Sequence, residues 1–298
     1  MASWQFGDVT VTRVEEQAGP LFDPTTFFPD YDAQRFAAER WMKPNFVSDD
    51  GRMLASIHTW ILRTPTHTIL IDGCVGDDKE RMPFADFHML KSPWLANLAA
   101  AGVRPEEVDF VMCTHLHVDH VGWNTRRENG RWVPTFPNAR YIFGSDEYAH
   151  WEAERRVEGA RGFAAMSQKV YDDSVVPVIE AGLADLVYDD HALLGQLLRI
   201  NLAPGHTPGS ITIALETPQR RALFTGDILH HPVQVAIPEW NSAFCGDPVQ
   251  ARASRRRVLD RCVDTNAILM PAHFGHPHCG HVQRKGEAFS LHPVEPDA

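Results

Sequence analysis

The chain has 298 residues, with 28 basic and 39 acidic side chains and a formal net charge of −11 when histidine is neutral. So acidic a chain repels phosphate backbones and anionic lipid, which argues against nucleic-acid and membrane partners. Hydrophobic residues make up 44% and charged residues 22% of the sequence, a composition typical of globular proteins and unlike that of disordered ones.

The cysteines and the amino terminus indicate the compartment. There are five cysteines, an odd number without a C-x-x-C pair, which favours free thiols in a reducing compartment. The first residues have neither a basic start nor an apolar core, so we expect no signal peptide. No apolar run approaches the roughly 20 residues that a membrane span needs. We therefore expect a soluble, cytoplasmic protein.

Predicted strands and helices alternate along the chain. The strand-like runs are Val9–Val14, Ile57–Leu62, Thr68–Asp72, Phe110–Cys113, Tyr141–Phe143, Leu198–Leu202, Ile211–Leu215, Ala222–Thr225 and Ala267–Met270. The helical patterns are Trp94–Ala101, Asp146–Val157 with Ser145 as its cap, and a helix opened by Asp247-Pro248 that ends near Val263. This alternation predicts an α/β chain with two sheets and one domain over residues 1–298.

Two segments depart from this alternation. Residues 20–46 are loop-like and rich in aromatic side chains: Phe22, Phe27, Phe28, Tyr31, Phe36, Trp41 and Phe46. They form either a segment pinned to the core by its aromatics or a lid or dimer arm that shapes an apolar pocket. Residues 291–298 are rich in proline and acidic residues, and we expect a flexible tail there.

Potential metal ligands follow four of the predicted strands. His115, His117, Asp119 and His120 lie within six residues, directly after the strand Phe110–Cys113. Farther along, single ligands follow further strands: His206, Asp227 and His273. Neutral imidazoles and carboxylates suit zinc, and a turn after a strand can direct alternate side chains at neighbouring ions. The sequence therefore predicts a metal site at one edge of a β structure.

The pattern H-x-H-x-D-H at His115–His120, followed in order by His206, Asp227 and His273, resembles that of the metallo-β-lactamase-fold hydrolases. The resemblance covers roughly Ile57–His273. It implies an αββα sandwich in which His115, His117 and His206 hold one metal, Asp119, His120 and His273 hold a second, and Asp227 bridges the two. It also implies that Asp72 supports a ligand histidine from behind, and we place Thr114 in the same supporting role.

The implied centre holds two Zn²⁺ per chain, with Mn²⁺, Co²⁺ or Fe²⁺ as substitutes. Two neighbouring cations lower the pKa of a bridging water, so that a hydroxide is available near neutral pH. That hydroxide would attack an electrophilic carbonyl carbon or phosphorus. Asp119 and Asp227 would be the catalytic residues that orient it and relay its proton.

Details of the motif narrow the choice within the superfamily. His117 stands where the diiron flavoproteins have glutamate, and Asp227 where the best-known zinc β-lactamases have cysteine. The remaining groups resemble quorum-quenching lactonases and methyl-parathion-type phosphotriester hydrolases. We therefore expect a hydrolase of an ester or lactone of an apolar or aromatic small molecule, and a homodimer is possible. The alternatives are a phosphotriester hydrolase, an iron-dependent sulfur dioxygenase-like enzyme and a non-catalytic metal-binding module.

Several other histidines have no assigned place in the motif. His230 and His231 closely follow Asp227, and one of them either supports the site or is structural. His276, His278 and His281 suggest a further metal cluster by their density, but a pocket wall or an exposed loop is the simpler interpretation.

Overall fold

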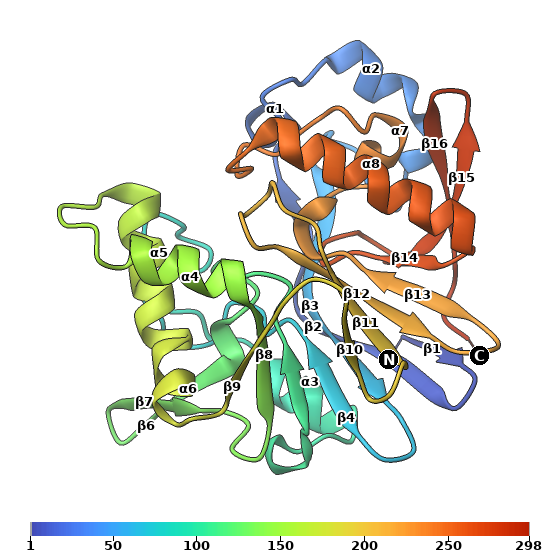
Figure 1. Cartoon of the computed structure of the whole chain (residues 1–298). Helices are drawn as coiled ribbons and strands as arrows, with labels where there is room; N and C mark the ends of the chain where they lie inside the picture. The colour runs from blue at the N-terminus through green and yellow to red at the C-terminus, as the bar shows by residue number, and fades with distance from the viewer. Residues whose placement is uncertain (1, 298) are drawn as a thin grey trace. The chain divides into compact units, whose positions relative to one another are not determined.

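The computed structural model describes residues 2–297, and the chain divides into two compact units (Figure 1). Unit 1 comprises the residues up to Glu16 together with Ile57–Tyr188. Unit 2 comprises Gln17–Ser56 and the residues from Asp189 onward. Strands β2 (Val9–Phe22) and β3 (Met53–Arg63) each contribute residues to both units. The organisation as one domain stays a prediction.

The first sheet has seven strands in the order β1-β2-β3-β4-β5-β8-β9. Its remaining strands are β1 (Ser3–Phe6), β4 (Thr68–Ile71), β5 (Phe110–Met112), β8 (Arg140–Gly144) and β9 (Ala184–Val187). Strands β4, β5, β8 and β9 pair in parallel. Parallel strands end at the same edge of a sheet, so the segments that follow β4, β5 and β8 are brought together there.

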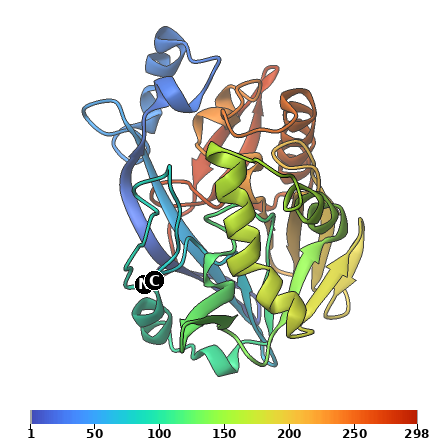
Figure 2. The ribbon, with the colours of Figure 1, turned by 90° about the vertical axis from the view of Figure 1, so that its left-hand side faces the viewer.

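Helices of unit 1 follow these strands. They are α3 (Trp94–Ala100), α4 (Ser145–Glu154), α5 (Gly162–Ser174) and α6 (Val176–Glu180), and a hairpin pairs β6 (Thr125–Glu128) with β7 (Arg131–Pro134). Helix α5, which is yellow-green in Figure 2, was not predicted from the sequence. The predicted cap at Ser145 is wrong, because Ser145 is the first helical residue and Gly144 precedes the helix without a side-chain hydrogen bond.

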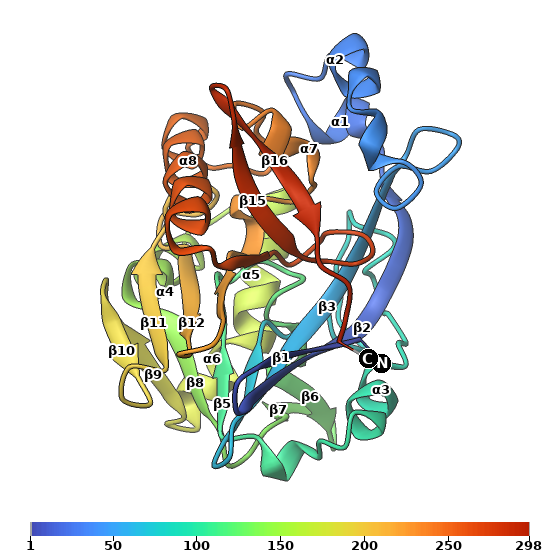
Figure 3. The same ribbon diagram turned by 90° about the vertical axis from the view of Figure 1, so that its right-hand side faces the viewer.

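The second sheet belongs to unit 2 and has the order β10-β11-β12-β13-β14-β15-β16. Its strands are β10 (His191–Leu193), β11 (Leu198–Leu202), β12 (Ile211–Glu216), β13 (Arg221–Phe224), β14 (Ile268–Met270), β15 (Gly280–Lys285) and β16 (Ala288–Pro293). Among the strand pairs described for this second sheet, only β13 and β14 pair in parallel. Figure 3 shows the β15–β16 hairpin, which includes Leu291 and corrects the predicted flexible tail over its first three residues.

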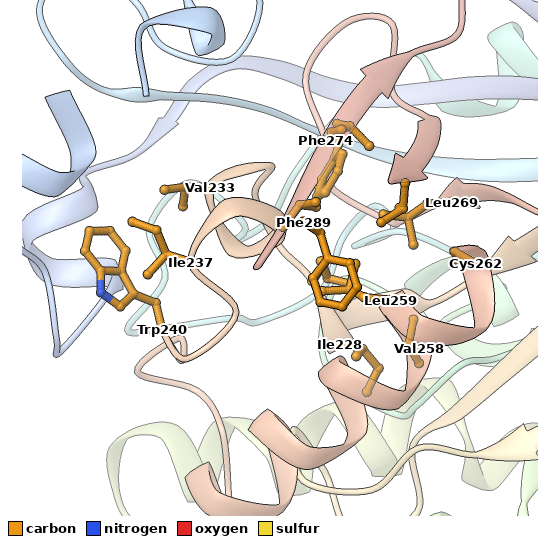
Figure 4. Packing of buried hydrophobic residues seen from close by; sticks show 14 of the residues in the cluster. Ile228, Val233, Ile237, Trp240, Val258, Leu259, Cys262, Leu269, Phe274 and Phe289 are labelled. Atoms are coloured by element: carbon orange, nitrogen blue, oxygen red, sulfur yellow. The ribbon is translucent and has the colours of Figure 1, made fainter. Parts of the chain in front are cut away.

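Helix α8 (Pro248–Thr265) begins where the sequence predicts it. The Asp247 side chain accepts hydrogen bonds from the backbone N–H groups of Val249 and Gln250, both at 3.0 Å. The apolar face of α8 packs on the other elements of unit 2. Its Val258 and Leu259 belong to the same apolar cluster as Leu269 and Phe289 (Figure 4). The short elements α7 (Val233–Ala236) and η4 (Gly226–Ile228) complete this unit on the carboxyl side of β13.

The aromatic segment 20–46 forms short helices rather than a continuous loop. They are α1 (Pro24–Phe27), α2 (Ala33–Ala38) and η1 (Arg40–Met42). Phe27, Phe28, Phe36 and Phe46 are buried in the same apolar cluster as Trp240. Burial of these rings anchors the segment to unit 2, whereas a role as lid or dimer arm stays a prediction.

Among residues 2–297, no helix is both long enough and apolar enough to cross a bilayer.

Candidate metal centre

Four predicted ligands of unit 1 lie in the turn that follows β5. His115, His117 and His120 are buried, and the Asp119 side chain is 14% exposed. The ring of His115 lies 4.6 Å from that of His117 and 4.0 Å from that of His120, measured between centroids. Nε2 of His120 lies 3.7 Å from Oδ1 of Asp119. The structure therefore brings these four side chains together within unit 1.

Asp72 holds this turn from the end of the neighbouring strand β4. Its carboxylate accepts hydrogen bonds from the Thr114 backbone N–H at 2.8 Å and from the Thr114 hydroxyl at 2.9 Å. Its Oδ2 also lies 2.9 Å from Nδ1 of His120. This carboxylate holds the Nδ1 proton of His120, so the Nε2 lone pair is left for a metal. Asp72 thus contacts both Thr114 and His120, and the role of Asp72 and Thr114 in supporting a metal ligand stays a prediction.

A second buried carboxylate, Glu147, supports the turn but was missed by the sequence analysis. It lies in the first turn of α4, directly after β8, and is 1% exposed. Its Oε1 accepts hydrogen bonds from the backbone N–H of Leu116 at 3.0 Å and from Nε1 of Trp151 at 2.7 Å. Leu116 lies between two of the predicted ligands, His115 and His117. The available signal was the position of Glu147 after a third parallel strand, where the ligand segments also begin.

The other three predicted ligands lie at one edge of the sheet in unit 2. Asp227 follows β13 and His273 follows β14, and these strands run in parallel. His206 lies in the connection between the antiparallel strands β11 and β12. Because β12 is also antiparallel to β13, that connection lies at the edge where β13 ends. The topology therefore brings the three segments together.

Asp227 is the centre of this group. Its Oδ1 lies 2.9 Å from Nε2 of His273, and its Oδ2 lies 3.3 Å from Nε2 of His206. A third imidazole, that of His230, places Nε2 3.2 Å from the same Oδ2. Burial lowers the pKa of His230, although the negative charge of Asp227 acts in the opposite direction.

His206 and His273 present their Nε2 atoms as metal-ligating histidines do. Nδ1 of His273 lies 3.1 Å from the backbone carbonyl of Ser56, and Nδ1 of His206 lies 4.0 Å from Sγ of Cys245. A contact at Nδ1 fixes the ring and directs Nε2 toward Asp227. Tetrahedral zinc with bonds of about 2.0–2.1 Å separates its ligand atoms by about 3.4 Å. The spacing between His206 and Asp227 fits this value, so the donor set is suited to a metal.

A glycine fixes the position of His206. Gly205 has φ +131°, and a Cβ atom on it would lie 2.1 Å from the backbone nitrogen of Ala251 in α8. The turn that carries His206 therefore packs directly on the backbone of α8, and no other residue fits there.

Aromatic rings surround His117 in unit 1. Its ring contacts Trp151 and Phe163 edge-on, with centroid separations of 5.5 Å and 5.7 Å. Phe163 is 37% exposed and contacts Phe84 in turn. This arrangement places an apolar, partly exposed surface beside a predicted ligand.

The remaining histidines have other surroundings. Nε2 of His231 lies 2.8 Å from the Phe46 carbonyl, and burial lowers its pKa to about 4. Nδ1 of His278 lies 2.7 Å from the Phe274 carbonyl, and the exposed His276 pairs with Glu295. Among the residues that the structure describes, neither these nor His281 belongs to a cluster of metal-ligating side chains.

The chain matches a protein-family model and several solved structures. Residues 54–273 match the model of the metallo-beta-lactamase superfamily. The solved structure of a hydrolase AbOPH in the beta lactamase superfamily is similar over 100% of this chain and 98% of that one, with a TM-score of 0.81 and 23% identity. The dizinc quorum-quenching lactonase AidC is similar over 99% and 98%, with a TM-score of 0.77 and 21% identity. A probable metal-dependent hydrolase from Staphylococcus aureus is similar over 97% and 99%, with a TM-score of 0.72 and 18% identity.

The chain belongs to the metallo-beta-lactamase superfamily, because the family model covers most of its length. The predicted α/β fold class is thereby confirmed. The prediction of a metal-dependent hydrolase is confirmed at this level of description. Membership implies that divalent metal is bound.

Proposed function

We propose that the chain is a dinuclear metal hydrolase that cleaves an ester or lactone of an apolar or aromatic small molecule. The arrangement around Asp227 carries this proposal, since its two carboxylate oxygens face the Nε2 atoms of two different histidines, His273 and His206. A carboxylate presented in this way is suited to bridging two metal ions. In the predicted ligand set, His115, His117 and His206 would hold one ion, and Asp119, His120 and His273 would hold the other.

The chemistry divides between the metals and the chain. When bound, two divalent cations would supply a nucleophilic hydroxide near neutral pH and polarise the carbonyl group of the substrate. The chain holds the ligands rigid, since Asp72 and Glu147 fix the turn after β5. Asp119, whose side chain is 14% exposed, would accept a proton during the reaction.

The surroundings of His117 support an apolar substrate. Phe163 and Trp151 contact its ring, and Phe163 remains 37% exposed. An apolar acyl or aryl group that covers Phe163 would be removed from water beside a ligand. The net charge of −11 disfavours a polyanionic substrate.

Acid release in a pH-stat tests the proposal. Zinc-loaded protein is assayed against matched panels of lactones, aryl esters and phosphotriesters, before and after chelation. We expect turnover of one carbonyl class that chelation abolishes and added zinc restores. D119A and D227A should lose activity and bound metal, whereas D264A, which alters a 66% exposed carboxylate, should keep both. Full activity in D119A or D227A would disprove the assignment.

The same experiment separates the alternatives. Turnover confined to phosphotriesters would replace the lactone assignment with a phosphotriester hydrolase on the same site. One iron per chain, together with oxygen uptake on a thiol substrate, would indicate a sulfur dioxygenase-like enzyme. Metal binding without turnover of any panel or thiol would indicate a non-catalytic module.

We further propose Zn²⁺ as the native metal, at two ions per chain, and a cytoplasmic location. All five cysteines are free thiols, and four of them are buried. Free buried thiols are typical of proteins from a reducing compartment. Metal analysis of protein purified without added metal tests the first point.

A further inference from the structure

His230 has the surroundings of a functional residue rather than of a core histidine. Its side chain is 4% exposed, and neither of its ring nitrogens has a hydrogen-bond partner of good geometry among residues 2–297. A buried polar group without a partner destabilises the fold, because its lost hydrogen bonds to water are not replaced. Nε2 nevertheless lies 3.2 Å from Oδ2 of Asp227, the nearest acceptor described for this ring.

The histidines around Asp227 differ at Nδ1. His273 has the Ser56 carbonyl at Nδ1, and His206 has Sγ of Cys245 there, so both rings can keep a proton at Nδ1 and a lone pair at Nε2. For Nδ1 of His230, by contrast, residues 2–297 provide no hydrogen-bond partner. Its proton is therefore best placed on Nε2, where it faces a carboxylate instead of a metal.

The ring of His230 is held in this orientation by its neighbours. It stacks on His273 with centroids 6.0 Å apart and planes at 14°, and it contacts His206 edge-on at 4.9 Å. Phe27 from α1 packs against it at 5.2 Å and 70°. Phe27 is buried, so the aromatic segment 20–46 shields this histidine from water.

We propose that His230 positions Asp227 by donating an Nε2–H hydrogen bond to its Oδ2, which leaves the other carboxylate lone pairs for metal. A carboxylate offers about four lone-pair sites, so one donor and two metals can be accommodated together. His230 is thus a positioning residue and not a ligand. This inference rests on the proposed function, because it concerns the carboxylate that bridges the metals.

The adjacent His231 provides a matched control. It is equally buried, but its Nε2 contacts the Phe46 carbonyl and its Nδ1 accepts the Val233 backbone N–H at 3.2 Å. Its contacts tie the segment 20–46 to the connection after β13 and involve no predicted ligand. Changes at this position should therefore affect stability and leave metal affinity unchanged.

The test measures zinc affinity by competition with a chelator and zinc stoichiometry by elemental analysis. H230F keeps a planar ring without a hydrogen-bond donor. It should lower zinc affinity at least about tenfold, the lower end of the usual effect of losing such a supporting residue. Two zinc ions should still bind at saturation. H230Q, whose amide N–H reaches about as far as Nε2, should restore most of the affinity. H231Q should bind zinc like the wild type. If H230F does not fold, H230N replaces it, because its shorter amide cannot reach Asp227.

Each result has a distinct meaning. Unchanged affinity in H230F, or in H230N if that variant is used, would overturn the assignment. Loss of one whole ion per chain would overturn it too, because His230 would then be a ligand. Failure of the wild type to bind zinc would instead overturn the proposed function. Absorption spectra of the Co²⁺-substituted variants provide a second measure, and the positions of the bands should be retained in H230Q.

Discussion

Oδ2 of Asp72 lies 2.9 Å from Nδ1 of His120, and both side chains are buried. The two residues follow neighbouring parallel strands, β4 and β5, and meet at the edge where both strands end. The same carboxylate accepts two hydrogen bonds from Thr114. One side chain therefore fixes both the ring and the backbone of the turn that holds four predicted ligands.

Replacing Asp72 by asparagine should weaken metal binding. Asparagine has a single acceptor oxygen, so it cannot accept both the Thr114 backbone N–H and the Nδ1 proton of His120. We expect D72N to lower zinc affinity by about 10–100-fold, as is typical for such supporting groups. D109N is the control, because the Asp109 carboxylate accepts the Thr68 backbone N–H at 2.8 Å at the other end of the same strands. Equal affinities of D72N and D109N in chelator competition would contradict the role of Asp72.

Removal of the Glu147 carboxylate should destabilise the fold. E147A leaves the Leu116 N–H and the Trp151 indole N–H buried without their acceptor, at about 1–3 kcal/mol for each. D146A removes a neighbouring, exposed carboxylate from the same first turn of α4 and should cost at most about 1 kcal/mol. Urea unfolding of both variants measures the difference, and similar losses would show that Glu147 acts only on the helix terminus.

Alanine at Gly205 should be far more harmful than alanine at Gly195. Both glycines have positive φ, but only at Gly205 would the new Cβ collide with backbone, at 2.1 Å from the Ala251 nitrogen. At Gly195 nothing lies within 4 Å of the new Cβ, so the only cost is the backbone strain of a positive φ, roughly 1–2 kcal/mol. Thermal unfolding should show a markedly larger loss in G205A, together with weaker zinc binding through His206. Equal losses would mean that the turn moves freely away from α8.

Glu16 should make stability depend on pH. Burial raises the pKa of this carboxyl from 4.5 to about 7, although four donors, from Val75, Trp123, Gly76 and Ser92, oppose the shift. Its folded pKa is above its unfolded value, so its contribution is complete below pH 4.5 and is lost as pH rises toward 7. E16Q removes this titration.

The stability of the wild type relative to E16Q should therefore fall by a few kcal/mol between pH 4.5 and pH 7. The measurement is the free energy of unfolding in urea at several pH values. E15Q, which alters the adjacent residue paired with Arg13, is the control for the loss of a neighbouring carboxylate. A difference between E16Q and the wild type that stays constant with pH would contradict the raised pKa.

Phe163 should contribute to the binding of apolar substrate groups. F163A removes an exposed ring that contacts His117, so KM should rise for substrates with long acyl or aryl groups and change little for short ones. V157A, which removes another exposed apolar side chain of unit 1, should leave KM unchanged for both the long and the short substrates. A uniform fall in kcat for all substrates would indicate instead that Phe163 positions His117.

Local sequence signals predict much of the fold. Asp247-Pro248 predicts the start of α8 because a cap acts within its own turn. Helix α5 was missed although Phe163, Met166 and Val170 have helical spacing, because glycine and charged residues precede them. The pairing of β15 with β16 was missed because β15 ends in charged residues and only its contacts with β14 and β16 stabilise it.

The sequence by itself determined the identity and order of the candidate ligands. Their order and spacing along the chain are fixed by the covalent backbone, and each candidate lies in a segment that follows a predicted strand. Asp72 and Thr114 were predicted as supports, but only the tertiary structure showed the contacts of Glu147 and distinguished His230 from His231. Glu147 comes from a distant helix, and the adjacent His230 and His231 have the same chemistry but contact Asp227 and Phe46, respectively. The physical reason is that a hydrogen bond or a pKa depends on what packs around a side chain. In this chain those neighbours come from segments far apart in sequence.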